Sequence, residues 1–393
     1  MKMPKINPQI LKWARETAGL TIEEAVKKIV LNGTKDTTAT ERLTKLESGE
    51  TEPTRSLLLK MAKQYHRPLI TFYMSSPPRQ GDRGQDFRTL SGLASNKANA
   101  WLDTLIRNVQ ARQGVLQAAL EDEEESDTLQ FIGSMKMEDG VPAVLESIQN
   151  TIHFNLSEFC SQRSPIEAFT LLREKVEAIG VFVLLMGDLG SHHTKIDPEI
   201  FRGFALANNI APFVIINDQD SRAAWSFTLL HELTHLWLGQ TGVSGARPEK
   251  EIEKFCNDVA SEFLLPSNEL ITIERGQSYE EIYLYINHFA NSRNLSNSMV
   301  AYKLFRRGQI DKAIWSRLNE AFQKLWFESQ TNKKNKNKDR TGGPDYYIVR
   351  RQRVGTALIN HVQRMMSGGI LTTTKAGKIL GVKAQNVHSL IGL

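Results

Sequence analysis

Two histidines four positions apart carry the clearest chemical signal in the sequence. His231 and His235 flank Glu232 within the apolar run Trp225 to Gly239. On a helix, this spacing places both imidazoles on one face, where they can hold a single ion. Glu232 is offset beside them, where a carboxylate can accept a proton from water on that ion without binding the ion itself. The pattern therefore predicts a catalytic metal centre.

A third ligand is expected downstream, because a catalytic zinc usually takes three protein ligands and keeps one position for water. Apolar Phe255, Val259 and Phe263 mark the inner face of the next predicted helix. Spacing alone does not decide whether Glu253 or Glu262 is the third ligand. The acidic residues in this region are Glu249, Glu251, Glu253, Asp258 and Glu262. The His-Glu-x-x-His pattern at 231–235 also arises by chance in ordinary proteins. The alternative interpretation is therefore that His231 and His235 are ordinary helical histidines that bind no metal.

Three short strands are predicted before the motif helix. Val181 to Met186 is an apolar, β-branched run, and Gly203 to Ala207 and Pro212 to Asn217 follow it. A small mixed sheet that leads into the motif helix is the expected local architecture. The last of these strands is expected to be an edge on which an extended substrate adds as a further strand.

The amino-terminal block reads as short helices joined by tight turns. Apolar residues recur at helical spacing in four segments, Gln9 to Ala18, Ile22 to Val30, Thr40 to Glu47 and Ser56 to Tyr65. Thr21 can cap the second helix with Glu24 as its capping-box partner. This arrangement predicts a helix-turn-helix module.

The segment Leu43 to Thr54 (LTKLESGETEPT) resembles the signature of the XRE (Cro/C1-type) helix-turn-helix family. In that family the second helix of the motif lies in the major groove. The resemblance implies base contacts from the exposed face that contains Thr40, Glu41, Thr44 and Lys45. The sequence departs from the family at Thr21-Ile22 and in a lengthened turn, Leu31 to Thr38. A docking or dimerisation unit is therefore the alternative to DNA binding.

The segment Glu253 to Pro266 (EKFCNDVASEFLLP) resembles the corresponding segment of ImmA/IrrE-type metallopeptidases. The resemblance implies that Glu253 is the third zinc ligand and that Asn257, one turn later, orients a ligand. Asp86-Phe87-Arg88 and Leu295 to Gly308 resemble further elements of long family members. The implied mechanism is attack on a peptide carbonyl by zinc-bound water, with Glu232 as the general base.

Composition limits the class of protein. The chain has 393 residues, which indicates two or three domains, and a formal net charge of +5, which permits nucleic-acid binding without requiring it. The two cysteines, Cys160 and Cys256, exclude a disulfide scaffold, and both are interpreted as bystanders. The longest apolar run is far shorter than the ~20 residues of a membrane span. We therefore expect a cytoplasmic protein with no membrane partner.

The predicted fold class is α+β and mostly helical, with a zincin-like domain that contains a small sheet. The expected divisions are a helix-turn-helix domain at 1–76, a helical connecting region at 77–150, a metallopeptidase domain at 151–328, a flexible basic linker at 329–344 and a small helical module at 345–393. A weaker helix-turn pattern, Ala376 to Val382, lies inside that last module, whose task the sequence leaves open.

Together these features predict a zinc-dependent endopeptidase. The family resemblance implies that it cleaves a repressor, an antitoxin or another regulatory protein, such as the product of an adjacent gene. By resemblance, the context would be transcription regulation, toxin–antitoxin pairs or phage defence. Double-stranded DNA at the N-terminal domain and a second copy of the chain in a homodimer are the other expected partners. The alternative is a DNA-binding regulator or toxin–antitoxin component whose metallopeptidase fold acts as a sensor or scaffold without turnover.

Overall fold

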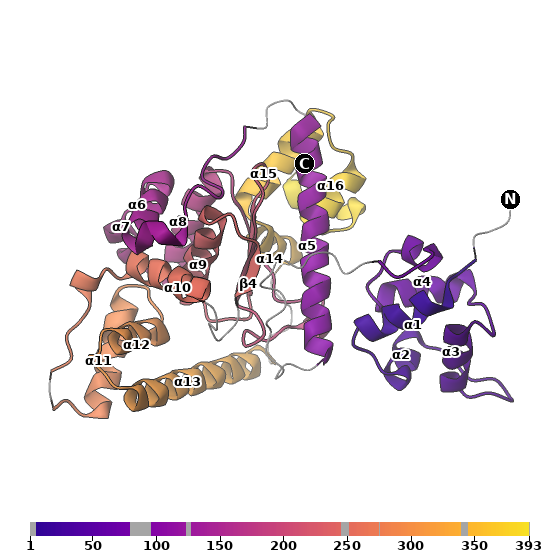
Figure 1. Cartoon of the computed structure of the whole chain (residues 1–393), viewed down its shortest axis with the longest axis horizontal. Helices are drawn as coiled ribbons and strands as arrows, with labels where there is room; N and C mark the ends of the chain where they lie inside the picture. Colours follow the sequence, from indigo (N-terminus) through magenta and orange to yellow (C-terminus); the bar gives the residue numbers. More distant parts are fainter. Residues whose placement is uncertain are drawn as a thin grey trace. The chain divides into compact units, whose positions relative to one another are not determined.

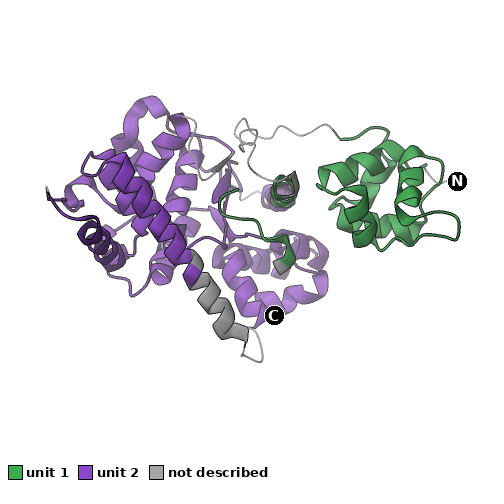
Figure 2. Cartoon of the chain, turned by 90° about the horizontal axis from the view of Figure 1, so that it is seen from below, with its two compact units in different colours: residues 1–109, 188–200 green, residues 110–187, 201–393 purple. Residues whose placement is uncertain are grey.

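The computed structural model describes residues 5–78, 96–122, 127–244, 251–274, 276–338 and 345–392. The chain divides into two compact units, one made of residues 1–109 and 188–200 and the other of residues 110–187 and 201–393 (Figure 2). Within the described ranges, no helix is both long enough and apolar enough to cross a membrane. The predicted Asp86-Phe87-Arg88 element lies outside the described residues.

The first unit contains a bundle of short helices. They are α1 (Pro8–Thr17), α2 (Ile22–Ile29), α3 (Ala39–Ser48), α4 (Arg55–Gln64) and the 3-10 helix η1 (Leu69–Tyr73) (Figure 1). Thr21 caps α2 and Thr38 caps α3, each through a capping box. The apolar sides of the helices meet in one core that includes Ile10, Leu43 and Phe72. The segment 188–200, with η4 (His192–Thr194), is grouped with this unit.

A buried ion pair joins α1 to α3. The Arg15 guanidinium donates from Nε to Glu47 Oε1 at 2.8 Å and from a terminal nitrogen to Oε2 at 2.9 Å. Arg15 also donates to the carbonyl of Leu20, at 2.9 Å. Such a two-pronged contact fixes the relative position of the two helices. Glu47, a residue of the XRE-like segment, thus has a structural role.

The second unit is built around a four-stranded sheet with the order β1-β3-β2-β4. Its strands are β1 (Phe182–Leu185), β2 (Gly203–Leu206), β3 (Phe213–Ile216) and β4 (Gly242–Ser244). β1 runs parallel to β3, whereas β2 is antiparallel to both β3 and β4. The three predicted strands and the mixed sheet are confirmed. The prediction that 212–217 forms an edge is wrong, because β3 is hydrogen-bonded on both sides.

Helices surround this sheet and share one large core with it. They are α6 (Gly140–Ile152), α7 (Leu156–Cys160), α8 (Pro165–Ala178), α9 (Trp225–Trp237), α10 (Glu251–Leu264), α11 (Tyr279–Ser292), α12 (Asn297–Arg306) and α13 (Lys312–Lys338). α9 contacts β2 and β3 and also packs against α10 (Figure 1). The mostly helical α+β class is therefore confirmed.

Two expected boundaries differ from the structure. Val144 and Ile148 on α6 are fully buried in the same core as α9, so the domain expected to begin at residue 151 includes earlier residues. α13 continues to Lys338, so residues 329–338 of the expected flexible linker are helical. That stretch contains neither glycine nor proline, the two residues least favourable in a helix interior. Residues 339–344 lie outside the described part.

The C-terminal module, residues 345–393, belongs to the second unit. It contains α14 (Tyr346–Val354), α15 (Thr356–Ser367), α16 (Thr373–Leu380), the 3-10 helix η6 (Ala384–Asn386) and α17 (Val387–Ile391). α5 (Asn96–Asp122) spans the boundary between the two units in sequence. α14 packs against β1 and α15 packs against α8. The expected separate module is therefore joined to the sheet domain.

Two buried charges connect this module to the sheet domain. Arg173 on α8 donates to Glu177 Oε1 at 2.8 Å and to the Gln352 carbonyl at 2.6 Å. It also donates to the Val183 carbonyl of β1. Glu177 Oε2 accepts the backbone N–H of Ala357, at 3.1 Å. The pair thus satisfies backbone groups of both the strand and the module.

Candidate metal centre

The motif helix α9 passes through the core of the second unit. Apart from Phe227, every residue from Trp225 to Trp237 is buried. Residues on every side of the helix are buried, as expected for a helix enclosed by the core. Gly239, with φ of +66°, follows its end. The packing of α9 therefore holds its polar side chains away from bulk water.

Two nitrogens and one carboxylate converge at this helix. The Nε2 atoms of His231 and His235 lie 3.2 Å apart. Glu253 on α10 places Oε2 at 3.2 Å from Nε2 of His231 and Oε1 at 3.2 Å from Nε2 of His235. The structure thus brings together all three residues expected as ligands.

These separations suit a single small ion. Ligand atoms about 2.1 Å from a tetrahedral zinc lie roughly 3.4 Å from one another, close to the separations between these donors. Two imidazoles and one carboxylate are a donor set that zinc takes in catalytic sites, where a fourth position stays open. The side chains present therefore fit a zinc ion.

Contacts around the site favour the protonation states in which His231 and Glu253 can bind a metal ion. The Oδ1 atom of Asn257 lies 2.9 Å from Nδ1 of His231, so a proton on Nδ1 leaves Nε2 free to bind an ion. Burial opposes ionisation of Glu253, but its contacts with His231 and His235 hold its pKa well below the ordinary value. Glu253 is therefore an ionised carboxylate, the form that binds metals.

Glu232 lies beside these donors and beneath strand β2. Its side chain is fully buried. A Cβ atom at Gly203 would lie 2.8 Å from Glu232 Oε1 and 2.7 Å from Cγ2 of Thr228. The strand can approach the helix this closely only because residue 203 has no side chain. The backbone of β2 thus forms one wall around the Glu232 carboxylate.

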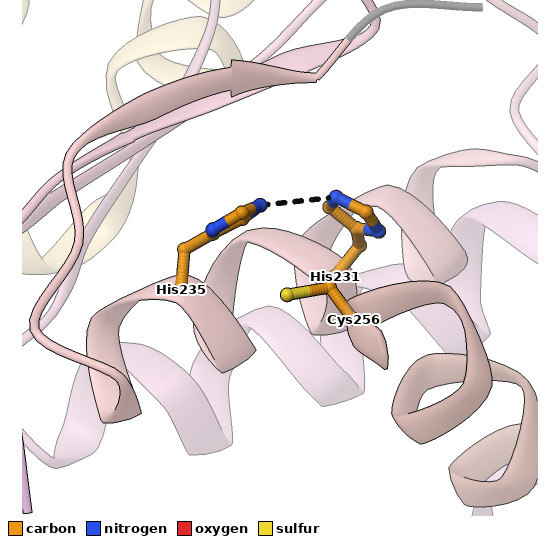
Figure 3. Close-up of side chains that lie close together, drawn as sticks. All are labelled: His231, His235 and Cys256. Carbon is orange, nitrogen blue, oxygen red and sulfur yellow. Dashed lines mark hydrogen bonds between the residues drawn. The ribbon is translucent and has the colours of Figure 1, made fainter. Parts of the chain in front are cut away.

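Cys256 is also near the two histidines, which the sequence analysis missed. Ligand atoms of His231, His235 and Cys256 all lie within 4.8 Å of one another (Figure 3). Burial raises the pKa of the Cys256 thiol, which favours its neutral form over the thiolate that binds metals. In the sequence, the only indication that Cys256 lies near the histidines is its position one helical turn after Glu253.

The other acidic residues considered on α10 have different partners. Glu262, which spacing left open as the third ligand, accepts from Lys303 Nζ at 2.7 Å and from Ser267 Oγ at 2.7 Å. Asp258 forms an ion pair with Arg306, at 3.0 Å. Glu251 lies at the first position of α10 and is exposed, and Glu249 lies outside the described residues.

The residues predicted to contact DNA lie together on α3 of the first unit. Glu41 and Thr44 are exposed, and Thr40 and Lys45 are partly exposed. However, the Glu41 carboxylate accepts the backbone N–H of Thr38 at 2.8 Å, as part of the capping box. Thr44 Oγ donates to the carbonyl of Thr40, at 3.1 Å. Glu41 thus stabilises the start of α3, and its predicted contact with DNA stays a prediction.

Comparison with known protein families matches part of the second unit. The family model Peptidase_M78, described as the IrrE N-terminal-like domain, matches residues 178–305. This range contains α9 and α10, and hence His231, Glu232, His235 and Glu253. The match supports the ImmA/IrrE resemblance and a metallopeptidase-family domain for this part of the chain. Comparisons with curated proteins and with solved structures found no match.

Proposed function

We propose that the second unit is a zinc-dependent peptidase that cleaves a regulatory protein. The observation that carries the proposal is the set of 3.2 Å separations between His231 Nε2, His235 Nε2 and the two Glu253 oxygens. The Peptidase_M78 match over residues 178–305 supports the class of reaction. The XRE-like helices in the same chain support a regulatory target over general protein digestion.

His231, His235 and Glu253 would hold the ion. When bound, the ion polarises a carbonyl and lowers the pKa of water towards about 7. Glu232 is the residue positioned to accept a proton, because it adjoins His231 on α9 and is shielded from solvent. Asn257 keeps the His231 ring oriented, and the Gly203 backbone confines the Glu232 carboxylate. Each residue acts from a rigid element of the core.

An extended polypeptide would add to the sheet at β4. Among the residues that the structure describes, this strand is at one end of the strand order and pairs only with β2. Gly203 of β2 pairs with Ser244 of β4 and also lies against Glu232. An exposed strand edge offers unpaired N–H and C=O groups, which bind extended peptides independently of side-chain sequence. A substrate at β4 would therefore lie near the proposed base.

The test combines metal content with cleavage. The full chain is co-expressed with the product of the adjacent gene, as wild type and as Glu232→Gln, and the partner is examined for a new fragment. We expect a fragment with wild type only, and about one zinc per chain in both proteins. His231→Ala should lose both properties, whereas His288→Ala, at an exposed histidine of α11, should lose neither.

Two outcomes would contradict this proposal. Cleavage by Glu232→Gln at the wild-type rate would remove the general-base role. Full zinc content in His231→Ala would remove the metal site. Zinc binding without cleavage of any candidate partner would favour the alternative of a metal-bound sensor or scaffold.

A further inference from the structure

The C-terminal module concentrates the positive charge of the protein. Residues 345–393 contain seven lysines and arginines and a single acidic residue, Asp345, a net charge of +6, whereas the whole chain carries +5. Lys375, Lys378 and Lys383 are exposed, and none of them forms an ion pair with a residue that the structure describes. A surface whose cations form no ion pairs attracts polyanions.

Within this module, two helical segments are joined by a three-residue turn. α16 ends at Leu380, and η6 begins at Ala384 and continues into α17. Gly381 enters the turn with φ of +66°, a left-handed conformation that favours glycine. A Cβ atom at Gly377 would lie 2.9 Å from the carbonyl oxygen of Val382, so a glycine in α16 lets the turn pack closely. This is the construction of a helix-turn-helix motif.

Two adjacent arginines of α14 donate hydrogen bonds to backbone carbonyls at the carboxyl ends of α16 and α17. Arg350 donates to the carbonyls of Leu380, at 3.1 Å, and Gly381, at 2.6 Å. Arg351 donates to the carbonyls of Leu390, at 2.7 Å, and Ser389, at 3.0 Å. Cations at helix carboxyl ends satisfy unpaired carbonyls and the helix dipole. The angle between the two segments is therefore fixed by the fold.

The segment after the turn has one buried side and one exposed side. Val387, Leu390 and Ile391 are buried, whereas Gln385 and His388 are exposed. Exposed amide and imidazole groups can make hydrogen bonds to base edges. Lysines on the preceding helix and in the turn suit contacts with phosphates, which position a protein on a duplex. The module thus has both kinds of group that such an interface needs.

We propose that the C-terminal module binds double-stranded DNA, with residues 384–391 in the major groove and Lys375, Lys378 and Lys383 on phosphates. The major groove of B-form DNA admits an α-helix, whereas that of A-form RNA is too deep and narrow for side-chain readout. The surface is independent of the N-terminal α3 and of the metal centre. The predicted DNA contact of α3 is a separate prediction, which this proposal does not require.

The test measures binding of the full chain to a labelled mixed-sequence 30-base-pair duplex by fluorescence anisotropy over a salt series. The Lys375→Ala, Lys378→Ala, Lys383→Ala triple variant is compared with Lys136→Ala, Lys312→Ala, Lys324→Ala. The control triple removes the same charge from exposed positions elsewhere in the second unit. We expect at least about a ten-fold rise in Kd for the first triple and a salt slope smaller by about 2 to 3, with the control unchanged.

A second measurement localises the contact in the wild-type protein and requires no variant. Hydrogen exchange of the backbone amides at 383–391 should become slower when the duplex is added. Equal Kd values and salt slopes for the two triples would overturn the proposal, as would unchanged exchange at 383–391. Tighter binding of single-stranded RNA than of the duplex would overturn the assignment to double-stranded DNA.

Discussion

The Oδ1 atom of Asn257 lies 2.9 Å from Nδ1 of His231, while the other ring nitrogen of His231 faces Glu253 at 3.2 Å. Asn257 and Glu253 are one turn apart on α10. One helix therefore supplies both a proposed ligand and the group that orients another ligand. Any shift of α10 along α9 would disturb both at once.

Replacing Asn257 should weaken metal binding without unfolding the protein. Asn257→Leu removes the acceptor at Nδ1 of His231, and we expect zinc affinity to fall by about 10 to 100-fold. Asn257→Asp keeps an acceptor and should remain closer to wild type. Competition with a chromogenic chelator measures both affinities. Equal affinities of Asn257→Leu and wild type would show that the hydrogen bond has no orienting effect.

Gly203→Ala should impair cleavage while the metal remains bound. The added methyl group would meet both Thr228 and the Glu232 carboxylate, so β2 or Glu232 must move. We expect unfolding free energy to fall by about 1–3 kcal/mol and cleavage to fall more than about ten-fold. Gly114→Ala on α5 is the matched control, because a Cβ there meets nothing within 4 Å. Normal cleavage by Gly203→Ala would argue against this constraint on the base.

The buried Arg173–Glu177 pair should show strong energetic coupling. Arg173→Met leaves the Glu177 carboxylate buried without its cation, which we expect to cost about 3–5 kcal/mol of unfolding free energy. The Arg173→Met, Glu177→Leu double variant should lose less than the sum of the single losses. Urea denaturation of the four proteins gives the coupling energy. Additive losses would show that the two side chains act independently.

The same pair gives a pH-dependent prediction. Burial already raises the pKa of Glu177, despite the opposing effect of Arg173, and removal of that cation raises the pKa further. A carboxyl group with a raised folded-state pKa contributes stability below its unfolded pKa and loses it as pH rises. Arg173→Met should therefore be least destabilised in acid and progressively more destabilised towards neutral pH. A pH-independent difference from wild type would contradict this.

Cys256→Ala tests whether Glu253 or Cys256 is the third ligand beside the two histidines. We expect it to retain about one zinc per chain, because Glu253 contacts both histidines and Cys256 is held as a neutral thiol. Glu253→Ala should lose the ion. Cys160→Ala provides a cysteine control away from the centre. Elemental analysis that finds no metal in Cys256→Ala would place the thiol among the ligands.

Local patterns predicted the elements around the metal centre well. Predicted strands at 181–186, 203–207 and 212–217 correspond to β1, β2 and β3 with differences of one residue at their ends. The motif helix was expected from Trp225 and is observed as α9. In each case a run of apolar residues ends at a turn-forming residue, so the signal lies within a few positions of the element itself.

Relationships between distant segments were not readable from the sequence. The parallel pairing of β1 with β3 places β3 inside the sheet, although this strand was expected to form an edge. The approach of Gly203 to Glu232 depends on packing between β2 and α9. Spacing on α10 left Glu253 and Glu262 equivalent, and Lys303, about forty positions onward, distinguishes them by its ion pair with Glu262. Such contacts are set by tertiary packing rather than by local preference.

The placement of α14 and Arg173 against β1 has a consequence for fragments of this protein. β1 is one end of the sheet, and its Val183 carbonyl is satisfied by Arg173, whose other contacts include the Gln352 backbone. A fragment that ends at Lys338 would lose α14 and uncover this strand edge, which could then pair with another chain. We therefore expect the tail to limit self-association through this edge. Such a fragment would keep the metal donors, which lie on α9 and α10, while exposing this edge.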